Sequence, residues 1–167
     1  MKRIQVMKQK GLLHQMMAMA LVGAATLPFA NESSAAESES KGPSNQQART
    51  MKIRMTIEGT VLTATLFDNQ TSRDFIGLLP ITLTLKDYAA TEKVSDLPKK
   101  LSTEGAPKGS DPSIGDITYY APWGNLAVFY KDFSFSSGLI KLGKIDSGVE
   151  VLTRPGPLRT TIELLQK

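Results

Sequence analysis

Apolar and polar residues alternate regularly along the chain after residue 50. Ile53, Met55 and Ile57 are each separated by one polar residue, and the same pattern returns over 62–66. A period of two places the apolar side chains on one face of a strand. Gly59 lies between the two segments and supplies a turn, so the pattern predicts a β-hairpin.

A short helix is predicted between Asp68 and Pro80, which ends it. Either Asn69 or Thr71 can cap its first turn, and Thr71 with Asp74 resembles a capping box. Apolar residues recur at helical spacing in the second half of this segment, and they would pack the helix onto the rest of the fold.

Further short segments have strand-like patterns. They are predicted as strands over 81–86, 92–97, 117–121, 126–130, 139–142, 149–152 and 161–165. The segment 126–130 is apolar at nearly every position, which is typical of a strand buried on both faces. With roughly eight short strands, the chain is predicted to be mainly β, a small closed eight-stranded barrel with one or two short helices.

Residues 1–36 have the pattern of a secretory signal peptide. Four basic groups precede an uncharged run of fifteen residues that ends at Ala30, and small residues follow. That run is shorter than the roughly 20 residues of a membrane-spanning helix. Cleavage after Ala36 fits better than cleavage after Ala30, where Pro28 would take a small-residue position. We expect a periplasmic or secreted protein with no stable membrane anchor after signal cleavage.

The chain after the predicted signal peptide divides into two predicted parts. Residues 37–50 are polar and are predicted to be a disordered linker, and 51–167 form the predicted barrel domain.

The net charge of the whole chain is +4, but residues 37–167 carry 16 basic and 15 acidic groups, a net charge of +1. Nucleic-acid binding needs a basic patch on the folded domain, so no nucleic-acid partner is expected.

The chain lacks the side chains on which several kinds of chemistry depend. It has no cysteine, and its single histidine, His14, lies in the predicted signal peptide. A mature chain without either residue has no thiolate or imidazole metal site and no Ser-His-Asp or cysteine nucleophile. We therefore expect no metal and no cofactor.

Seven residues are candidate ligand-binding side chains, because aromatic rings with a few polar groups can line a concave apolar pocket. They are Trp123, Tyr119, Tyr120, Asn125, Tyr130, Phe133 and Glu92. Packing of the barrel is the competing interpretation, and it is favoured for Phe129 and Tyr130.

Three of these candidates have specific alternatives. Trp123 lies in a turn flanked by proline and glycine, so a ligand-facing role is as consistent with its position as a structural one. Phe133, together with Phe135 and Tyr88, would either extend a pocket or cover the barrel end. Glu92 is either a polar group of the pocket or an ordinary surface carboxylate.

Four segments resemble the bacterial cyclophilin-like proteins, a family of small stand-alone domains. They are FIGLLPITLTLKDY (75–88), TEKVSDLP (91–98), GDITYYAPWGNLAVFYKDF (115–133) and GLIKLGKIDSG (138–148). The resemblance covers about residues 51–152. It implies a cyclophilin-like barrel of eight strands, closed at its ends by helices.

True cyclophilins are prolyl isomerases in which an arginine after a Phe-His pair stabilises the twisted amide. This chain has no Phe-His-Arg, and the corresponding region offers only Glu92, Lys93, Lys99 and Lys100. Lysine lacks the planar fork of a guanidinium. The resemblance therefore implies a protein that binds a peptide or small ligand without efficient catalysis. The alternative is a divergent peptidyl-prolyl isomerase that acts on envelope proteins.

A third class of function is an enzyme that uses aspartate, glutamate or lysine side chains. Two carboxylates within roughly 5–9 Å of each other in a deep pocket would support it. Carboxylates scattered over the surface would count against it.

Overall fold

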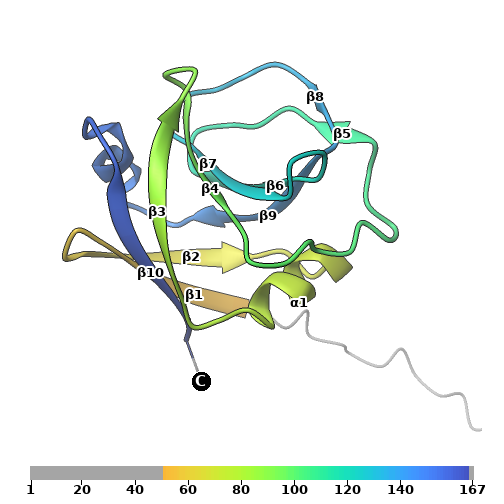
Figure 1. The fold of residues 1–167 in the computed structure, drawn as a ribbon, viewed down its shortest axis with the longest axis horizontal. Helices are drawn as coiled ribbons and strands as arrows, with labels where there is room; N and C mark the ends of the chain where they lie inside the picture. Colours follow the sequence, from red (N-terminus) through yellow and green to blue (C-terminus); the bar gives the residue numbers. More distant parts are fainter. Residues whose placement is uncertain (1–50, 166–167) are drawn as a thin grey trace, which may run out of the picture. The chain divides into compact units, whose positions relative to one another are not determined.

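The computed structural model describes residues 51–165, so the predicted signal peptide and linker lie outside the described residues. The elements, in chain order, are β1 (Met51–Ile57), β2 (Thr60–Leu66), α1 (Gln70–Ile76), β3 (Ile81–Tyr88), β4 (Glu92–Asp96), β5 (Gly109–Ser110), β6 (Asp116–Tyr120), β7 (Asn125–Phe129), β8 (Ser136–Ser137), β9 (Leu139–Ile145), η1 (Val149–Thr153) and β10 (Leu158–Leu164). Eight strands close into an antiparallel barrel in the order β1-β10-β3-β4-β7-β6-β9-β2 (Figure 1). The predicted mainly β, eight-stranded closed barrel is confirmed.

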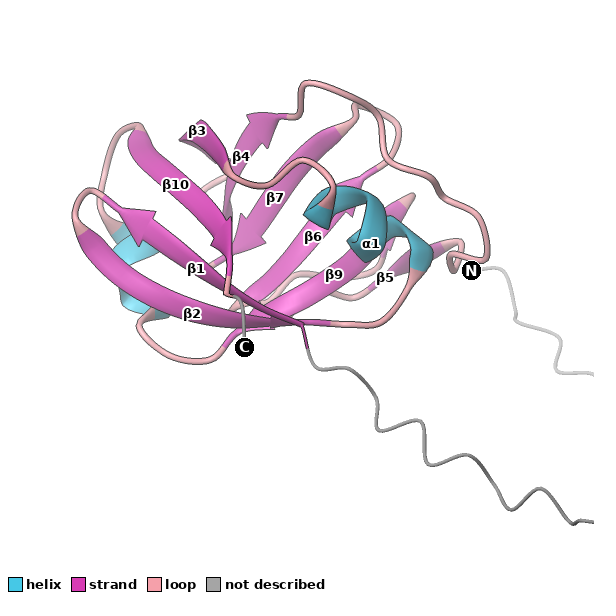
Figure 2. Cartoon of the chain, turned by 90° about the horizontal axis from the view of Figure 1, so that it is seen from below, coloured by secondary structure: helices cyan, strands magenta, loops and turns pink. Residues whose placement is uncertain are grey.

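Two features lie outside this barrel. The α-helix α1 and the 3-10 helix η1 lie near its opposite ends (Figure 2). The strands β5 and β8 pair in a separate two-stranded sheet. This sheet was not predicted, because strands of two residues are too short to show alternation. Over residues 51–165 no helix is long and apolar enough to cross a membrane.

The strands β1 and β2 form the predicted hairpin. Ile53, Met55 and Ile57 are fully buried, whereas the residues between them are exposed or half-buried. Glu58 and Gly59 make the turn with φ of 45° and 81°. Positive φ at both central residues characterises the type I′ turn, whose twist matches that of the flanking strands.

Asn69, one of the two predicted capping residues, caps the helix α1. Asn69 Oδ1 accepts a hydrogen bond from the Ser72 amide at 2.8 Å, so Asn69 is the capping residue. The predicted capping box of Thr71 and Asp74 is wrong. Thr71 Oγ1 donates to the Ser102 carbonyl at 2.8 Å, and Asp74 accepts from the Ser102 amide at 2.8 Å. Both side chains therefore tie the helix to the loop before β5.

The strand predicted over 149–152 is wrong, because these residues belong to η1. Gly148 precedes the helix with φ of 85°, a left-handed conformation that takes the chain out of its extended path. Val151 and Leu152 are neighbours in sequence and both are buried. A strand sends successive side chains to opposite faces, whereas a helical turn packs both against the barrel end.

The strand β7 is buried along its whole length, as predicted. Leu126 and Val128 belong to the core inside the barrel. Ala127 and Phe129 belong instead to a second, smaller apolar cluster with Leu139. This second cluster lies on the outer face of the barrel, and it forms the base of the candidate site.

The neighbouring strand β4 carries a fully buried lysine. Lys93 Nζ donates to Asp87 Oδ2 at 2.7 Å and to the carbonyls of Arg154 and Gly156 at 2.7 and 2.9 Å. The hydrogen bond from Lys93 holds the pKa of the Asp87 carboxyl below its usual value. These bonds tie β4 to the segment between η1 and β10.

Candidate functional site

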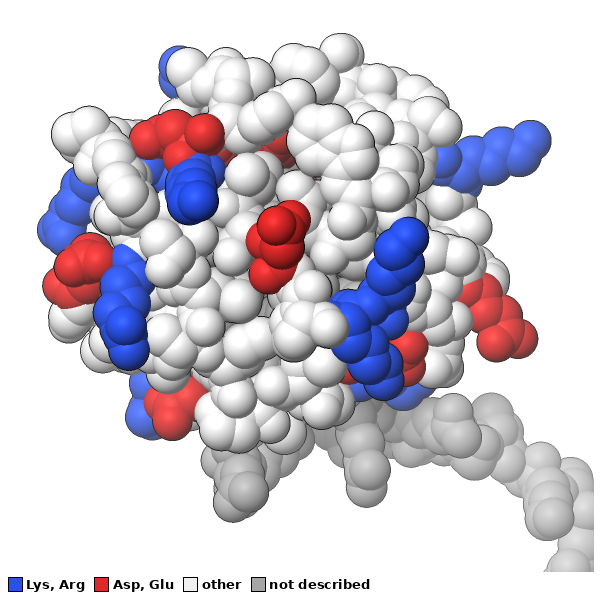
Figure 3. Space-filling model, viewed as in Figure 1, with Lys and Arg blue, Asp and Glu red and all other residues white. Residues whose placement is uncertain are grey.

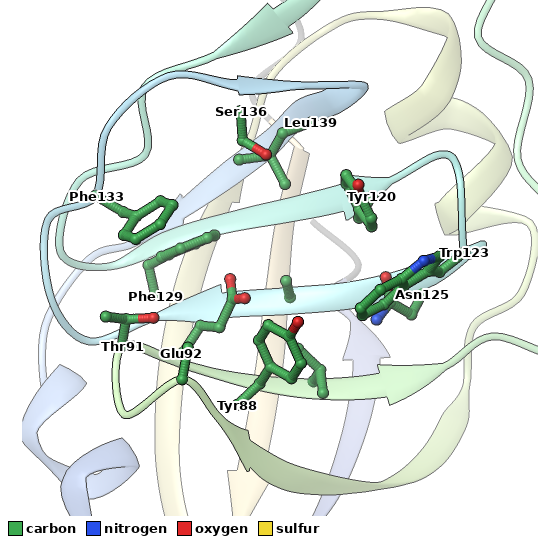
Figure 4. A pocket seen from close by; sticks show the side chains of 13 residues that line it. Tyr88, Thr91, Glu92, Tyr120, Trp123, Asn125, Phe129, Phe133, Ser136 and Leu139 are labelled. Carbon is green, nitrogen blue, oxygen red and sulfur yellow. The ribbon is translucent and has the colours of Figure 1, made fainter.

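A pocket of about 240 Å³ lies on the outer face of the barrel, over β4, β6 and β7. Side chains from these strands, from the end of β3 and from the segment after β7 converge on it (Figure 4). The lining residues are Tyr88, Ala89, Thr91, Glu92, Val94, Tyr120, Trp123, Asn125, Ala127, Phe129, Phe133, Ser136 and Leu139. The pocket is therefore mainly apolar and aromatic, with few polar groups, as ligand sites are.

The floor of the pocket is the outer face of β7. Asn125, Ala127 and Phe129 alternate with the residues of the barrel core, so all three point outward. Asn125 is only 4% exposed, and its Oδ1 is buried without a hydrogen-bond partner among residues 51–165. An unpartnered buried acceptor costs about 1–3 kcal/mol.

Glu92 is the second polar group of the pocket. Its side chain rises from β4 between Phe129 and Tyr88 (Figure 4). Within residues 51–165 it forms no ion pair. Burial raises the pKa of Glu92 to about 7 from its ordinary value of 4.5. The carboxyl therefore titrates near neutral pH, where small changes in its surroundings decide its charge.

At one end of the pocket, the Trp123 ring packs edge-to-face against two tyrosine rings. The Trp123 ring lies 5.5 Å from the Tyr88 ring at 87° and 5.3 Å from the Tyr120 ring at 84°, measured between centroids. Edge-to-face pairs of this kind stabilise each other by about 0.5–1.5 kcal/mol. Trp123 nevertheless stays 57% exposed, so these contacts hold a large apolar ring at the surface.

A strained turn forms part of the rim. Ala89 and Ala90 connect β3 to β4 with φ of 49° and 53°, and the Thr91 amide donates to the Tyr88 carbonyl at 3.1 Å. Left-handed conformations cost alanine about 1–2 kcal/mol relative to glycine or asparagine. The turn places Tyr88 directly opposite Glu92 in the antiparallel pair, so both side chains reach the pocket.

The charges of the site limit its chemistry. Glu92 is the single carboxylate among the residues that line the pocket, and no lysine or arginine lines it. The paired carboxylates of the enzyme hypothesis are therefore not found there. In the described part of the chain no three acidic side chains are grouped closely enough to hold a metal ion. Basic and acidic side chains are interspersed on the face shown in Figure 3, without a patch of one sign.

The sequence profile of the Cyclophilin-like family matches residues 55–163, which is nearly the whole barrel. The chain belongs to the Cyclophilin-like family. The solution structure of a hypothetical protein from Archaeoglobus fulgidus is similar to this cyclophilin-like chain, with a TM-score of 0.54 and 17% sequence identity. That match covers 72% of this chain and 99% of the archaeal chain, and it shows a shared fold. No curated protein matches the chain.

The cyclophilin-like barrel brings five of the seven candidate residues together in the pocket. They are Trp123, Tyr120, Asn125, Phe133 and Glu92. Tyr119 lies instead inside the barrel, where its hydroxyl accepts a hydrogen bond from the Leu101 amide at 3.2 Å. Tyr130 packs beside the core, and its hydroxyl donates to Asp87 at 3.0 Å. Neither of these two tyrosines lines the pocket.

Other lining residues of this cyclophilin-like protein were not predicted as such. Phe129 was expected to fill the barrel interior, but it is buried on the outer face and lines the pocket. The alternation along β7 contained the signal, because residues 125, 127 and 129 must share a face. The sequence alone did not show which of the two buried faces of β7 points into the barrel and which points outward. Thr91, Ser136 and Leu139 carried no such signal.

Proposed function

We propose that this cyclophilin-like protein binds a peptide or small ligand in the aromatic pocket without efficient catalysis. The observation that carries the proposal is a pair of polar groups in a mainly apolar cavity: within residues 51–165, Asn125 Oδ1 has no hydrogen-bond partner and the Glu92 carboxylate forms no ion pair. A buried polar group is normally hydrogen-bonded. A ligand that donates to these oxygens would remove the cost of leaving them unpaired.

The lack of a basic side chain in the pocket favours binding over isomerisation. In true cyclophilins, with which the resemblance compares this chain, an arginine stabilises the twisted amide. Within residues 51–165, the arginines are Arg54, Arg73, Arg154 and Arg159, and none lines the pocket. A site without a fixed cationic donor has little to offer a twisted prolyl amide over a planar one.

We further propose that the protein works outside the cytoplasm. The signal-peptide pattern of residues 1–36 supports this location. The mature N-terminus, determined by sequencing the exported protein, is expected to follow Ala36. A mature chain that still begins at Met1 in the cytoplasmic fraction would contradict export.

A thermal-shift screen of the full chain against peptides and small molecules tests the binding proposal. A ligand that binds only the folded state raises the melting temperature by mass action. Trp123→Ala should abolish the shift, because it removes the ring that two other aromatics hold at the rim. Phe67→Ala is the matched control, since Phe67 is an exposed aromatic that lines a different cavity.

A protease-coupled prolyl-peptide assay separates binding from catalysis. We expect the rate with the protein to equal the uncatalysed rate. A rate well above it, lost in Trp123→Ala and kept in Phe67→Ala, would overturn the proposal in favour of a divergent isomerase.

A further inference from the structure

We propose that the ligand of this pocket carries an alkylammonium group, which binds between the Glu92 carboxylate and the rings of Trp123 and Tyr88. This inference rests on the proposed ligand-binding function and names the chemistry of the ligand. It follows from three observations, which concern the carboxylate, the aromatic rings and the buried amide oxygen.

The first observation is that Glu92, which is half-buried, forms no ion pair within residues 51–165, whereas three other acids of the fold do. Asp116 is almost fully buried, and Lys141 Nζ lies 2.7 Å from it. Asp146 has Lys52 at 2.9 Å, and Asp87 has Lys93 at 2.7 Å. Each of these acids has a lysine of the same chain.

Glu92 has no such partner within residues 51–165, although its neighbour Lys93 directs its ammonium to Asp87. A carboxylate held in an apolar pocket without a cation is stabilised by any cation that enters.

The second observation is the set of perpendicular rings beside this carboxylate. Tyr88 lies opposite Glu92 across the β3–β4 turn, and Trp123 packs edge-to-face against Tyr88. Figure 4 shows Glu92, Tyr88 and Trp123 around the same hollow. The face of an aromatic ring attracts a cation within about 6 Å of its centroid, and aromatic cages use this attraction to hold ammonium groups.

The third observation is that the floor of the pocket offers a second acceptor of hydrogen bonds. Asn125 Oδ1 is buried in the floor without a donor. An ammonium or amide N–H on the ligand supplies what this oxygen lacks. The cavity of about 240 Å³ is smaller than the roughly 300–1,000 Å³ of pockets that enclose drug-sized ligands, so it fits one head group. A lysine side chain of a peptide and a small free amine share this chemistry.

The surroundings of Glu92 also determine how binding depends on pH. The titratable side chains that share the pocket are Tyr88 from β3 and Tyr120 from β6. Tyr130 follows β7, and burial, with the charges of Asp87 and Glu92, raises its pKa. No cation faces Glu92 from these elements, so an ammonium ligand binds best when Glu92 is ionised. Affinity should therefore fall as the pH falls below about 7.

The test uses the fluorescence of Trp123, the one tryptophan of the full chain, as a direct report from the pocket. Choline is compared with its uncharged isostere dimethylbutanol at about pH 8 and about pH 5.5. At the higher pH we expect choline to bind about tenfold more tightly than the uncharged alcohol. At the lower pH this preference for choline should shrink.

Two variants test whether the preference comes from the proposed groups. Glu92→Gln should remove the preference for choline, whereas Glu150→Gln, which changes an exposed glutamate outside the pocket, should keep it. Tyr88→Leu removes a ring without removing the tryptophan, and it should reduce the preference several-fold. A preference for choline that is undiminished in Glu92→Gln or in Tyr88→Leu would overturn the inference.

A second arm distinguishes the two sources of the ammonium group. A blocked alanine-lysine-alanine tripeptide is compared with its norleucine counterpart and with butylamine. Tighter binding of the lysine tripeptide than of butylamine identifies a peptide side chain, and equal binding identifies a free amine. Equal binding of charged and neutral probes overturns the inference but leaves the proposed binding function intact. Binding of none of these probes also overturns it, and the broader thermal-shift screen then decides the binding function separately.

Discussion

The two faces of β7 follow different rules. Its inner face, Leu126 and Val128, lies in a barrel core in which apolar side chains pack against one another. Its outer face, Asn125, Ala127 and Phe129, is buried just as deeply but includes an amide oxygen without a partner. One face is built for stability alone, whereas the other keeps an unsatisfied group beneath a half-open pocket.

This difference shows that burial and stabilisation are separate properties of a site. A fully apolar outer face would cost less free energy, because no acceptor would lose its hydrogen bond to water. The pocket also keeps an exposed tryptophan, a partly buried carboxylate and a strained turn. Such features concentrate where a protein contacts its ligand.

Removing a side chain from the inner face should have the largest effect on stability. Leu126→Ala is expected to lower the free energy of unfolding by about 2–5 kcal/mol, since it leaves a cavity in a packed core. Val94→Ala on the pocket side should cost about 1 kcal/mol, because Val94 is only half-buried. Urea denaturation measures both, and equal losses would mean that the pocket side of the barrel is packed as tightly as its core.

The buried lysine beside the pocket should have the next largest effect. Lys93→Met is expected to lower the free energy of unfolding by about 2 kcal/mol, because two backbone carbonyls and Asp87 Oδ2 lose a donor, although Asp87 Oδ1 keeps the one from Tyr130. Asp87 stays partly solvated, which limits the loss. Lys86→Met, on an exposed position of β3, should change stability by less than about 0.5 kcal/mol. Equal effects would show that the ammonium contributes nothing to stability.

Two asparagine variants should change stability in opposite directions. Asn125→Leu is expected to raise the free energy of unfolding by about 1 kcal/mol, because it removes an unpaired buried acceptor. It should also abolish ligand binding. Asn69→Ala should lower the free energy of unfolding by about 1 kcal/mol, because Asn69 caps α1. Thermal unfolding and the thermal-shift screen test both effects, and a destabilised Asn125→Leu would mean that the amide has a structural role.

The pH dependence of stability should reveal the half-buried carboxyl of Glu92 in the pocket. Because the pKa of Glu92 is raised to about 7, the folded state holds its proton between pH 4.5 and 7 while the unfolded state releases it. The free energy of unfolding therefore falls as the pH rises through this range, by about 1 kcal/mol after screening by solvent.

Glu92→Gln should remove this decline, and Glu163→Gln, on an exposed pair with Arg54, should keep it. Denaturation at several pH values provides the measurement. Parallel curves for the wild type and Glu92→Gln would mean that Glu92 is an ordinary surface carboxylate.

The two β-turns should show the smallest difference. Replacing Ala89 by asparagine and Ala90 by glycine is expected to raise the free energy of unfolding by about 0.5–1 kcal/mol, since both positions have positive φ. Gly59→Ala in the β1–β2 turn should have the opposite sign, because φ is 81° there. Calorimetry of both variants suffices, and a destabilised β3–β4 variant would show that the alanines are not strained.

The interior of the barrel was predictable where a strand has one buried face and one more exposed face. Alternation around Ile53 and Met55 was enough to place β1 and β2 in the fold. The segment 149–152 is also mainly apolar, and Val149 and Val151 flank Glu150 as they would in a strand, but Val151 and Leu152 are both buried and the segment forms a helical turn. Composition alone therefore does not distinguish a strand from a short helix.

The pocket was predictable in part. The motif around Trp123 indicated an aromatic cluster, but Phe129 was assigned to the wrong face. Both faces of β7 are buried, so the hydrophobic pattern cannot tell inside from outside. The loop that carries Phe133 has no periodicity, and its position depends on tertiary contacts such as the hydrogen bond from the Phe133 amide to the Pro112 carbonyl.

Because Glu92 and Lys93 are adjacent and oppositely charged, the charge inside the pocket depends on the register in which β4 pairs with its neighbours. A slip of this strand by one residue would send the ammonium outward into the aromatic pocket and the carboxylate inward toward Asp87. The inward carboxylate would then repel Asp87, and the two carbonyls that Lys93 now serves would lose their donor. Lys93 therefore disfavours the shifted register of β4. A barrel in that register would carry the opposite charge in its pocket, and it would also be less stable.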